Sequence, residues 1–239
     1  MKTALLTIYP ITLCLEIVLL IFAFALGKNP FQEKENAPFS VKRYFPHELI
    51  SGKKATPARV CLYLNAGLSL WNGTVLLLLL LDSTFSYLTL LCALTNIANL
   101  LRVASFFALT IVPSNETKPH LAIFCVYGCL SVIYFLLGGF TLMNLAKVTE
   151  FANLVLPTNF IYALMVVLFL LCVVSVLLFC SKKLAHWYEL DTEMDKSGVI
   201  VAKRPKVFIL ALYEWLFLFF GIAANFALLL GAILGISNI

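Results

Sequence analysis

Charged residues are scarce in this sequence of 239 residues, and their scarcity limits the kind of fold that it can adopt. Asp, Glu, Lys and Arg together make up 12% of the chain, against about 25% in soluble globular domains, while 62% of the residues are hydrophobic. Unbroken apolar runs such as 76–81 and 166–171 would aggregate in water but suit lipid hydrocarbon. The composition therefore excludes a soluble fold and predicts an all-α bundle of transmembrane helices.

The sequence also lacks the linkers that separate domains. No Ser/Gly-rich stretch and no long polar segment interrupts the apolar pattern, so residues 1–239 are predicted to form a single membrane domain. The first apolar stretch, 3–25, is too long for the core of a signal peptide and lacks a small-residue cleavage site after it. We expect it to remain as the first helix.

Motifs of soluble catalysis and of metal binding are missing as well. There is no phosphate-binding glycine loop, no HExxH sequence and no pair of Cys-x-x-Cys motifs with ligand spacing. The histidines His47, His120 and His186 lie singly in or beside polar segments, where ordinary surface residues are the commoner interpretation. We therefore predict no catalytic residue, no metal or other cofactor and no nucleic-acid partner, and we favour a non-enzymatic protein over an enzyme.

Six apolar stretches are present, each near the ~20 residues that a helix needs to cross a bilayer. They are separated by turn-forming or helix-breaking residues at Gly27, Asp82, Pro113, Pro157 and Ser181. The predicted spans are 4–26, 59–81, 84–112, 120–142, 160–180 and 207–235.

Six spans place loops one, three and five on one face of the membrane, which we call side B, and both termini on the opposite face, side A. Twelve of the 17 Lys and Arg residues lie in loops one and five, 27–58 and 181–206, and this charge bias favours a cytosolic side B that meets anionic lipid. Loop three contains a glycosylation sequon, Asn115-Glu116-Thr117, which is usable only if side B is lumenal or extracellular. The two signals disagree about the orientation.

Ionisable residues inside spans are functional candidates, because charge is disfavoured in hydrocarbon. Counting residues places Glu16, Arg102 and Glu214 at one depth, so we expect Arg102 to pair with Glu214 or Glu16. Helical spacing puts Thr95, Asn99 and Arg102 on one face of the third span. It likewise puts Glu214, Gly221 and Asn225 on one face of the sixth span. This layer is interpreted either as hydrogen bonds between helices or as a ligand site. The full set of predicted site residues is Glu16, Asn65, Asn99, Arg102, His120, Glu214 and Asn225.

Short motifs spread along the chain resemble one membrane protein family. The segment 49–57, which ends in Thr56-Pro57 and is followed by Asn65 in the second span, is similar to the damage-regulated autophagy modulator (DRAM) family. Asn29-Pro30, His120 and Glu214-Trp215 extend the resemblance over the whole chain. Two departures are Tyr213, where the family usually has Cys, and the strongly basic loop one.

The resemblance implies a non-enzymatic protein that modulates lipid organisation, trafficking or autophagy. The family includes lysosomal modulators of autophagy, a Golgi factor in maturation of GPI anchors, and plasma-membrane regulators of phosphoinositide kinase complexes. The expected partners are membrane lipids and a protein bound at loops 27–58 and 181–206. The expected location is an endomembrane (lysosome, Golgi or ER) or the plasma membrane, with cytosolic termini. Two alternatives remain open: a small transporter or channel lined by Glu16, Arg102 and Glu214, and a lipid-modifying enzyme with His120 and Glu214 as acid and base.

Overall fold

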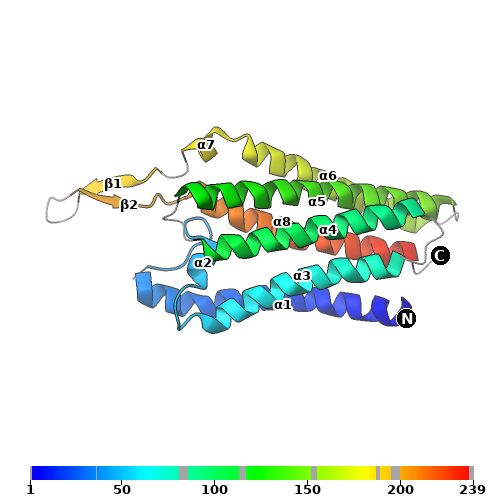
Figure 1. Ribbon diagram of the computed structural model, residues 1–239, viewed down its shortest axis with the longest axis horizontal. Helices are drawn as coiled ribbons and strands as arrows, with labels where there is room; N and C mark the ends of the chain where they lie inside the picture. Colours follow the sequence, from blue (N-terminus) through cyan, green and yellow to red (C-terminus); the bar gives the residue numbers. More distant parts are fainter. Residues whose placement is uncertain are drawn as a thin grey trace.

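The six apolar stretches form six long helices that pack into a bundle in the computed structural model of the chain (Figure 1). The structure describes residues 2–35, 37–80, 86–112, 117–151, 155–186, 189–194 and 200–236. Each of the six helices is long and apolar enough to cross a bilayer, which confirms the predicted all-α, multi-pass membrane fold. The long helices are α1 Lys2–Glu35, α3 Thr56–Leu80, α4 Ser86–Ile111, α5 Thr117–Phe151, α6 Val155–Phe179 and α8 Ile209–Ile236.

The outer surface of the bundle is suited to lipid. Large apolar side chains such as Ile11, Ile21 and Leu177 are more than 60% exposed, which in water would be an aggregation hazard. Helix α8 packs against α1, α3, α5 and α6 and is the most buried of the spans. Polar residues on α8 therefore face the interior of the bundle rather than lipid.

The C-terminal ends of four helices lie within one residue of the prediction, and those of α1 and α5 were predicted too early. The start of α6 was predicted five residues too late: the helix begins at Val155, so Pro157 lies in its first turn and does not separate two spans. Helix α1 continues nine residues past the predicted end at 26, to Glu35, and α5 continues nine residues past 142, to Phe151. The prediction stopped where the apolar run stops, but a helix continues with polar side chains once it leaves hydrocarbon. Gly27 does not end α1: a Cβ there would lie 2.7 Å from the Leu49 side chain, so this glycine permits close packing instead.

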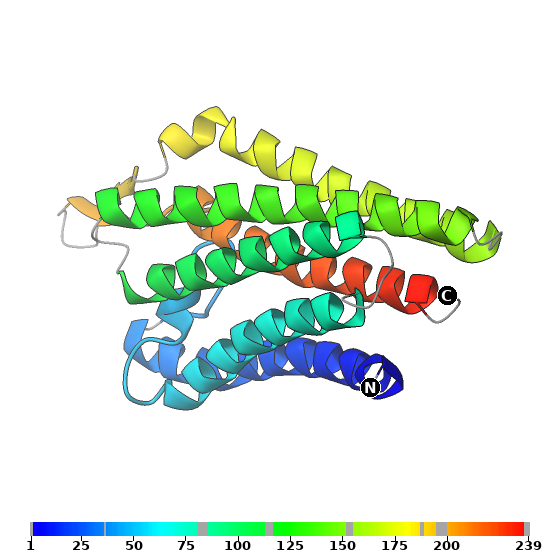
Figure 2. The same ribbon diagram turned by 45° about the vertical axis from the view of Figure 1, so that its right-hand side comes forward.

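The two ends of the bundle are built differently. The N- and C-termini lie at one end, side A, whereas the short elements all lie at the other, side B, in both views (Figures 1 and 2). This arrangement matches the predicted assignment of loops to the two sides. The short elements are α2 Pro46–Leu49, α7 Lys182–Ala185, β1 Asp191–Met194 and β2 Ile200–Lys203.

Loop one folds back over the side B end, and we call residues 37–55 the side B cap. Three contacts join the cap to α8 and to the segment that precedes it. The Arg204 guanidinium pairs with the Glu48 carboxylate at 2.7 Å. The Trp215 indole N–H donates to the Tyr44 carbonyl at 2.8 Å, and the Phe208 amide donates to the Lys42 carbonyl at 2.7 Å. The cap is therefore part of the packed fold.

Loop five contains a β-hairpin that the sequence analysis did not predict. Strands β1 and β2 pair antiparallel, with Asp191 opposite Lys203 and Met194 opposite Ile200. The prediction of a charged loop for 181–206 was incomplete here, because strands of four residues are too short to give a clear alternating pattern. The hairpin projects from side B, beyond the helices (Figure 1).

Cysteine labelling tests the predicted placement of the loops. Lys147, near the side A end of α5, and Lys203, in β2, lie at opposite ends of the bundle. In sealed vesicles, a membrane-impermeant maleimide is expected to label Lys147→Cys and Lys203→Cys from opposite sides. The parent chain, with its seven native cysteines, provides the background. Labelling of both positions from the same side would contradict the six-span layout.

Asn115 lies outside the described residues, so its glycosylation remains a prediction. Asn115 is expected to be glycosylated only if side B is lumenal, as in the family topology; in that orientation endoglycosidase should shift the mobility of the chain, and the shift should vanish in Asn115→Gln. The lysine and arginine bias opposes this orientation. A chain that shows no shift and whose Lys203→Cys variant labels from the cytosolic side would contradict it.

Candidate functional site

A polar cluster lies deep in the bundle around the Glu16 carboxylate of α1. Asn72 of α3 donates a hydrogen bond to Glu16 Oε2 at 2.9 Å, and Asn225 of α8 donates to Glu16 Oε1 at 3.0 Å. Asn65 donates to the Glu16 backbone carbonyl at 2.6 Å. Glu16 is only 1% exposed, so the amides of Asn72 and Asn225 replace the water that would otherwise solvate its carboxylate.

Arg102 of α4 supplies the cation of this cluster. Its guanidinium donates to Asn99 Oδ1 at 2.8 and 3.1 Å and to Ser69 Oγ at 3.0 Å. Its Cζ lies 5.0 Å from the ring centre of Tyr134, within cation–π range. Ser69 Oγ also accepts a hydrogen bond from Asn225 at 2.9 Å, so this one hydroxyl joins the arginine to the amide that holds Glu16.

A small cavity adjoins the cluster. Its volume is about 20 Å³, room for one water molecule. The Tyr127 hydroxyl is buried at its edge and has no hydrogen-bond partner among the described residues. A cavity of this size does not admit a solute, so the described conformation favours packing between helices over a permeation path. The lining residues are Glu16, Asn65, Ala66, Ser69, Arg102, Val103, Phe106, Tyr127, Leu218 and Ile222.

The expected direct pair between Arg102 and a carboxylate is wrong. In the described part of the chain, neither Glu214 nor Glu16 lies within 4.0 Å of the guanidinium. Glu214 is only five residues from the start of α8, about 8 Å along its axis, whereas Arg102 is nine residues from the end of α4, about 14 Å. The three ionisable residues therefore occupy two levels, and Glu214 is too shallow to reach Arg102.

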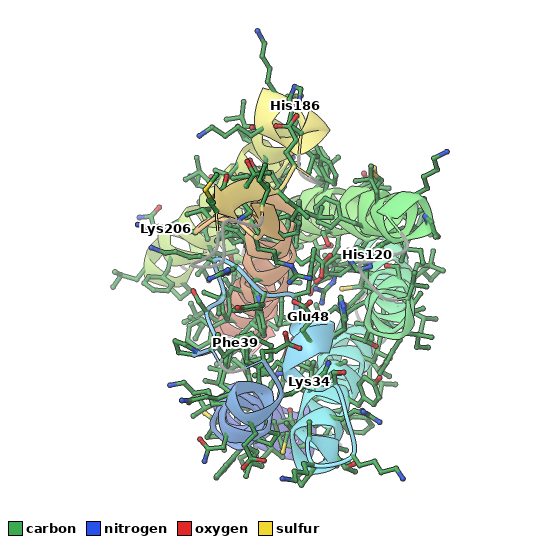
Figure 3. All side chains as sticks on the ribbon, turned by 90° about the vertical axis from the view of Figure 1, so that its left-hand side faces the viewer. Lys34, Phe39, Glu48, His120, His186 and Lys206 are labelled. Carbon is green, nitrogen blue, oxygen red and sulfur yellow. The ribbon has the colours of Figure 1, made fainter. Side chains whose placement is uncertain are left out.

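A second cluster lies nearer to side B and contains Glu214 with His120. His120 Nε2 lies 2.8 Å from Glu214 Oε1, and both side chains are at most 2% exposed. His120 Nδ1 lies 2.9 Å from the Val112 carbonyl oxygen, which can only accept, so Nδ1 carries a hydrogen and donates it. Viewed onto side B, His120 and Glu48 lie among the helices, whereas His186 lies at the outer edge (Figure 3).

The side B cap adds His47 to this second cluster. One ligating atom from each of His47, His120 and Glu214 lies within 4.8 Å of the other two. The Phe45 ring packs against both imidazoles, with centroids 5.3 Å from His47 and 5.0 Å from His120. Burial, followed by the charges of His120 and Arg204, lowers the pKa of His47 to about 3, so the ring is neutral at pH 7.

The seven residues predicted from sequence are thus divided between two clusters. The deep cluster contains Glu16, Asn65, Asn99, Arg102 and Asn225, and the shallower cluster contains His120 and Glu214. The sequence analysis missed His47, Ser69 and Tyr134. A serine or tyrosine in an apolar span carries no signal of its own, and nothing near His47 in sequence indicates that the cap folds onto α5 and α8.

Comparison with known proteins assigns no family: no family model, no curated protein and no solved structure matches this chain. What the sequence and the fold show together is an integral multi-pass membrane protein with six candidate spanning helices and two buried polar clusters.

Proposed function

We propose that the protein binds anionic lipid headgroups at side B and thereby modulates lipid organisation, trafficking or autophagy in its membrane. The proposal takes side B as cytosolic, the orientation that the lysine and arginine bias favours. The observation that carries it is the concentration of exposed lysines at this end, where each lysine near the cytosolic surface adds to the attraction for anionic lipid. Among the described side chains, Lys147 is the exposed lysine of side A. The exposed lysines of side B are Lys28, Lys34, Lys42, Lys53, Lys54, Lys118, Lys182, Lys183 and Lys206.

A groove at the edge of the side B cap supports headgroup binding. It has a volume of about 270 Å³ and is lined by Lys34, Lys53 and Lys54 together with Glu33 and the turn at Gly52. Lys54 pairs with Glu33 at 2.5 Å, but both side chains are largely exposed. Exposed pairs of this kind are weak, so a lipid phosphate can take the place of the carboxylate.

The resemblance to the DRAM family supports the cellular side of the proposal. Members of that family act in autophagy, in GPI-anchor maturation and in the control of phosphoinositide kinase complexes and lipid asymmetry, and the last three involve membrane lipids. The motifs that carry the resemblance include the cap segment 49–57, which contributes Ser51, Gly52, Lys53 and Lys54 to the groove.

Lipid retention tests the proposal. The chain is purified in detergent, incubated with equal amounts of phosphatidylcholine and a phosphoinositide, and analysed by native mass spectrometry. We expect preferential retention of the phosphoinositide, and a loss on the order of fivefold for each lysine removed in the Lys34→Gln, Lys53→Gln, Lys54→Gln variant. Lys147→Gln serves as the side A control and should retain as much as the unaltered chain. Equal retention of both lipids, or no change in the triple variant, would contradict the proposal.

The pair of His120 and Glu214 favours lipid modification as a second function. A buried imidazole 2.8 Å from a carboxylate has the geometry of a general acid–base pair, and it lies near the side B end, where headgroups are found. Reconstituted protein is expected to convert a labelled membrane lipid, with loss of the product in Glu214→Gln. Product formation that Glu214→Gln leaves unchanged would contradict this second function.

A further inference from the structure

Three atoms able to bind a cation converge beneath the side B cap. His47 comes from the cap, His120 from the start of α5 and Glu214 from the start of α8, so three separate segments place one ligating atom each within 4.8 Å of the others. Two of the three side chains are at most 2% exposed, and His47 is half-buried. No other such group of His, Cys, Asp and Glu occurs in the described part of the chain.

A proton alone does not satisfy all three side chains. His120 donates its Nδ1 hydrogen to Val112, so its Nε2 needs either a second proton or another cation to face Glu214 at 2.8 Å. One proton shared by Nε2 and the carboxylate would satisfy this pair. His47 would remain outside it, and its buried Nδ1 has no hydrogen-bond partner among the described residues. A metal ion would be bound by all three.

We propose that His47, His120 and Glu214 form a binding site for a divalent transition metal, and that zinc is the ion that fits it. Two imidazoles and one carboxylate are a known ligand set for zinc, and three protein ligands leave a fourth position to water. The hydrogen bond from His120 Nδ1 to a backbone carbonyl is the outer contact that metal-binding histidines usually make, because it fixes the ring and its tautomer.

The distances and charges around the three ligands suit a bound dication. Ligand atoms of a tetrahedral zinc ion, with bonds of about 2.0–2.1 Å, stand about 3.3 Å apart. The pair of His120 and Glu214 needs to open slightly from 2.8 Å, and His47, which is only half-buried, has to move inward. The nearby carboxylate of Glu48 in the cap is paired with Arg204 at 2.7 Å, so these two charges compensate each other. With neutral imidazoles, Glu214 gives the three ligands one negative charge, which favours a cation.

Metal analysis of the purified protein tests the site. The chain is prepared in detergent without a polyhistidine tag, loaded with zinc, passed into metal-free buffer and measured by inductively coupled plasma mass spectrometry. We expect about one zinc ion per chain, and a loss of at least about tenfold in His47→Ala and in His120→Ala. Because His47 lies on the half-exposed cap, His47→Ala remains informative if His120→Ala fails to fold.

His186→Ala is the matched control. His186 faces Glu189 at 2.7 Å on the surface. It therefore forms a histidine–carboxylate pair like that of His120 and Glu214, but an exposed one without a third ligand. It should retain as much zinc as the unaltered chain, and zinc bound by cysteines would be unchanged in all variants. Cobalt gives a second measurement, since tetrahedral Co²⁺ absorbs visible light and His47→Ala should abolish that absorption. Equal zinc in the unaltered chain and in a folded His47→Ala variant would overturn the proposal, as would an equal loss in His186→Ala.

Discussion

Replacing Arg102 by methionine is expected to lower the free energy of unfolding by about 3 kcal/mol, the lower end of what removal of one buried charge from a pair produces. The guanidinium is 4% exposed and donates three hydrogen bonds, to Asn99 and Ser69. Methionine fills similar volume without the charge. The loss arises because Asn99 Oδ1 and Ser69 Oγ lose their donor and the Glu16 carboxylate of the same cluster loses its compensating cation.

A double-mutant cycle identifies the carboxylate that Arg102 compensates. Arg102→Met combined with Glu16→Gln should recover more than ~1 kcal/mol of the sum of the single losses, because both charges are then removed. Arg102→Met combined with Glu214→Gln should be additive, because Glu214 belongs to the cluster with His120. Unfolding by sodium dodecyl sulfate, followed by far-ultraviolet circular dichroism, supplies the free energies. Coupling to Glu214 but not to Glu16 would contradict the division into two clusters.

Gly221→Ala is expected to lower the free energy of unfolding by about 2–3 kcal/mol through overpacking against Arg102. A Cβ at this position would lie 2.0 Å from Arg102 Nη1 and 2.9 Å from Cζ, so the guanidinium must move. It moves away from Ser69 and Asn99, whose hydrogen bonds to a charged group are lost or lengthened. The same unfolding assay measures the effect.

Gly67→Ala is the control for this change, because nothing lies within 4 Å of the Cβ that it would add. It should raise stability by about 0.5–1 kcal/mol, since alanine restricts the unfolded chain more than glycine does in a helix. Placing Gly221→Ala in the Arg102→Met background should remove most of its effect. If Gly221→Ala remained equally destabilising there, the clash would be with the backbone and not with the guanidinium.

The arrangement of the spans was predictable from sequence because hydrocarbon imposes it. A bilayer demands about 20 apolar residues and internal hydrogen bonding, so apolar length alone locates each helix. Helix α4 at Ser86–Ile111 lies within two residues of the predicted 84–112. The extensions of α1 and α5 and the β-hairpin carry more polar side chains, and in such segments hydropathy carries no information about where a helix ends.

The polar residues of the site were predictable, but their partners were not. Polar side chains in apolar spans stand out, so Glu16, Arg102 and Glu214 were identified as buried, and they are. Pairing them required depth to be known within a few ångströms, and the helix ends moved by up to nine residues. His47 depended on how the cap folds, which is decided by contacts such as the one between Arg204 and Glu48, 156 positions apart in sequence.

Glu16 and Asn225 form a hydrogen bond across 209 positions of sequence, between the first span and the last. A chain is synthesised from its N-terminus, so α1 enters the bilayer long before α8 exists. During that interval the Glu16 carboxylate has only the Asn72 amide of α3 as a donor and lacks the Asn225 amide of α8. An intramembrane carboxylate with too few donors is disfavoured by hydrocarbon. A nascent or truncated chain without α8 therefore exposes a polar defect in its first helix, and completion of the last helix is the event that removes it.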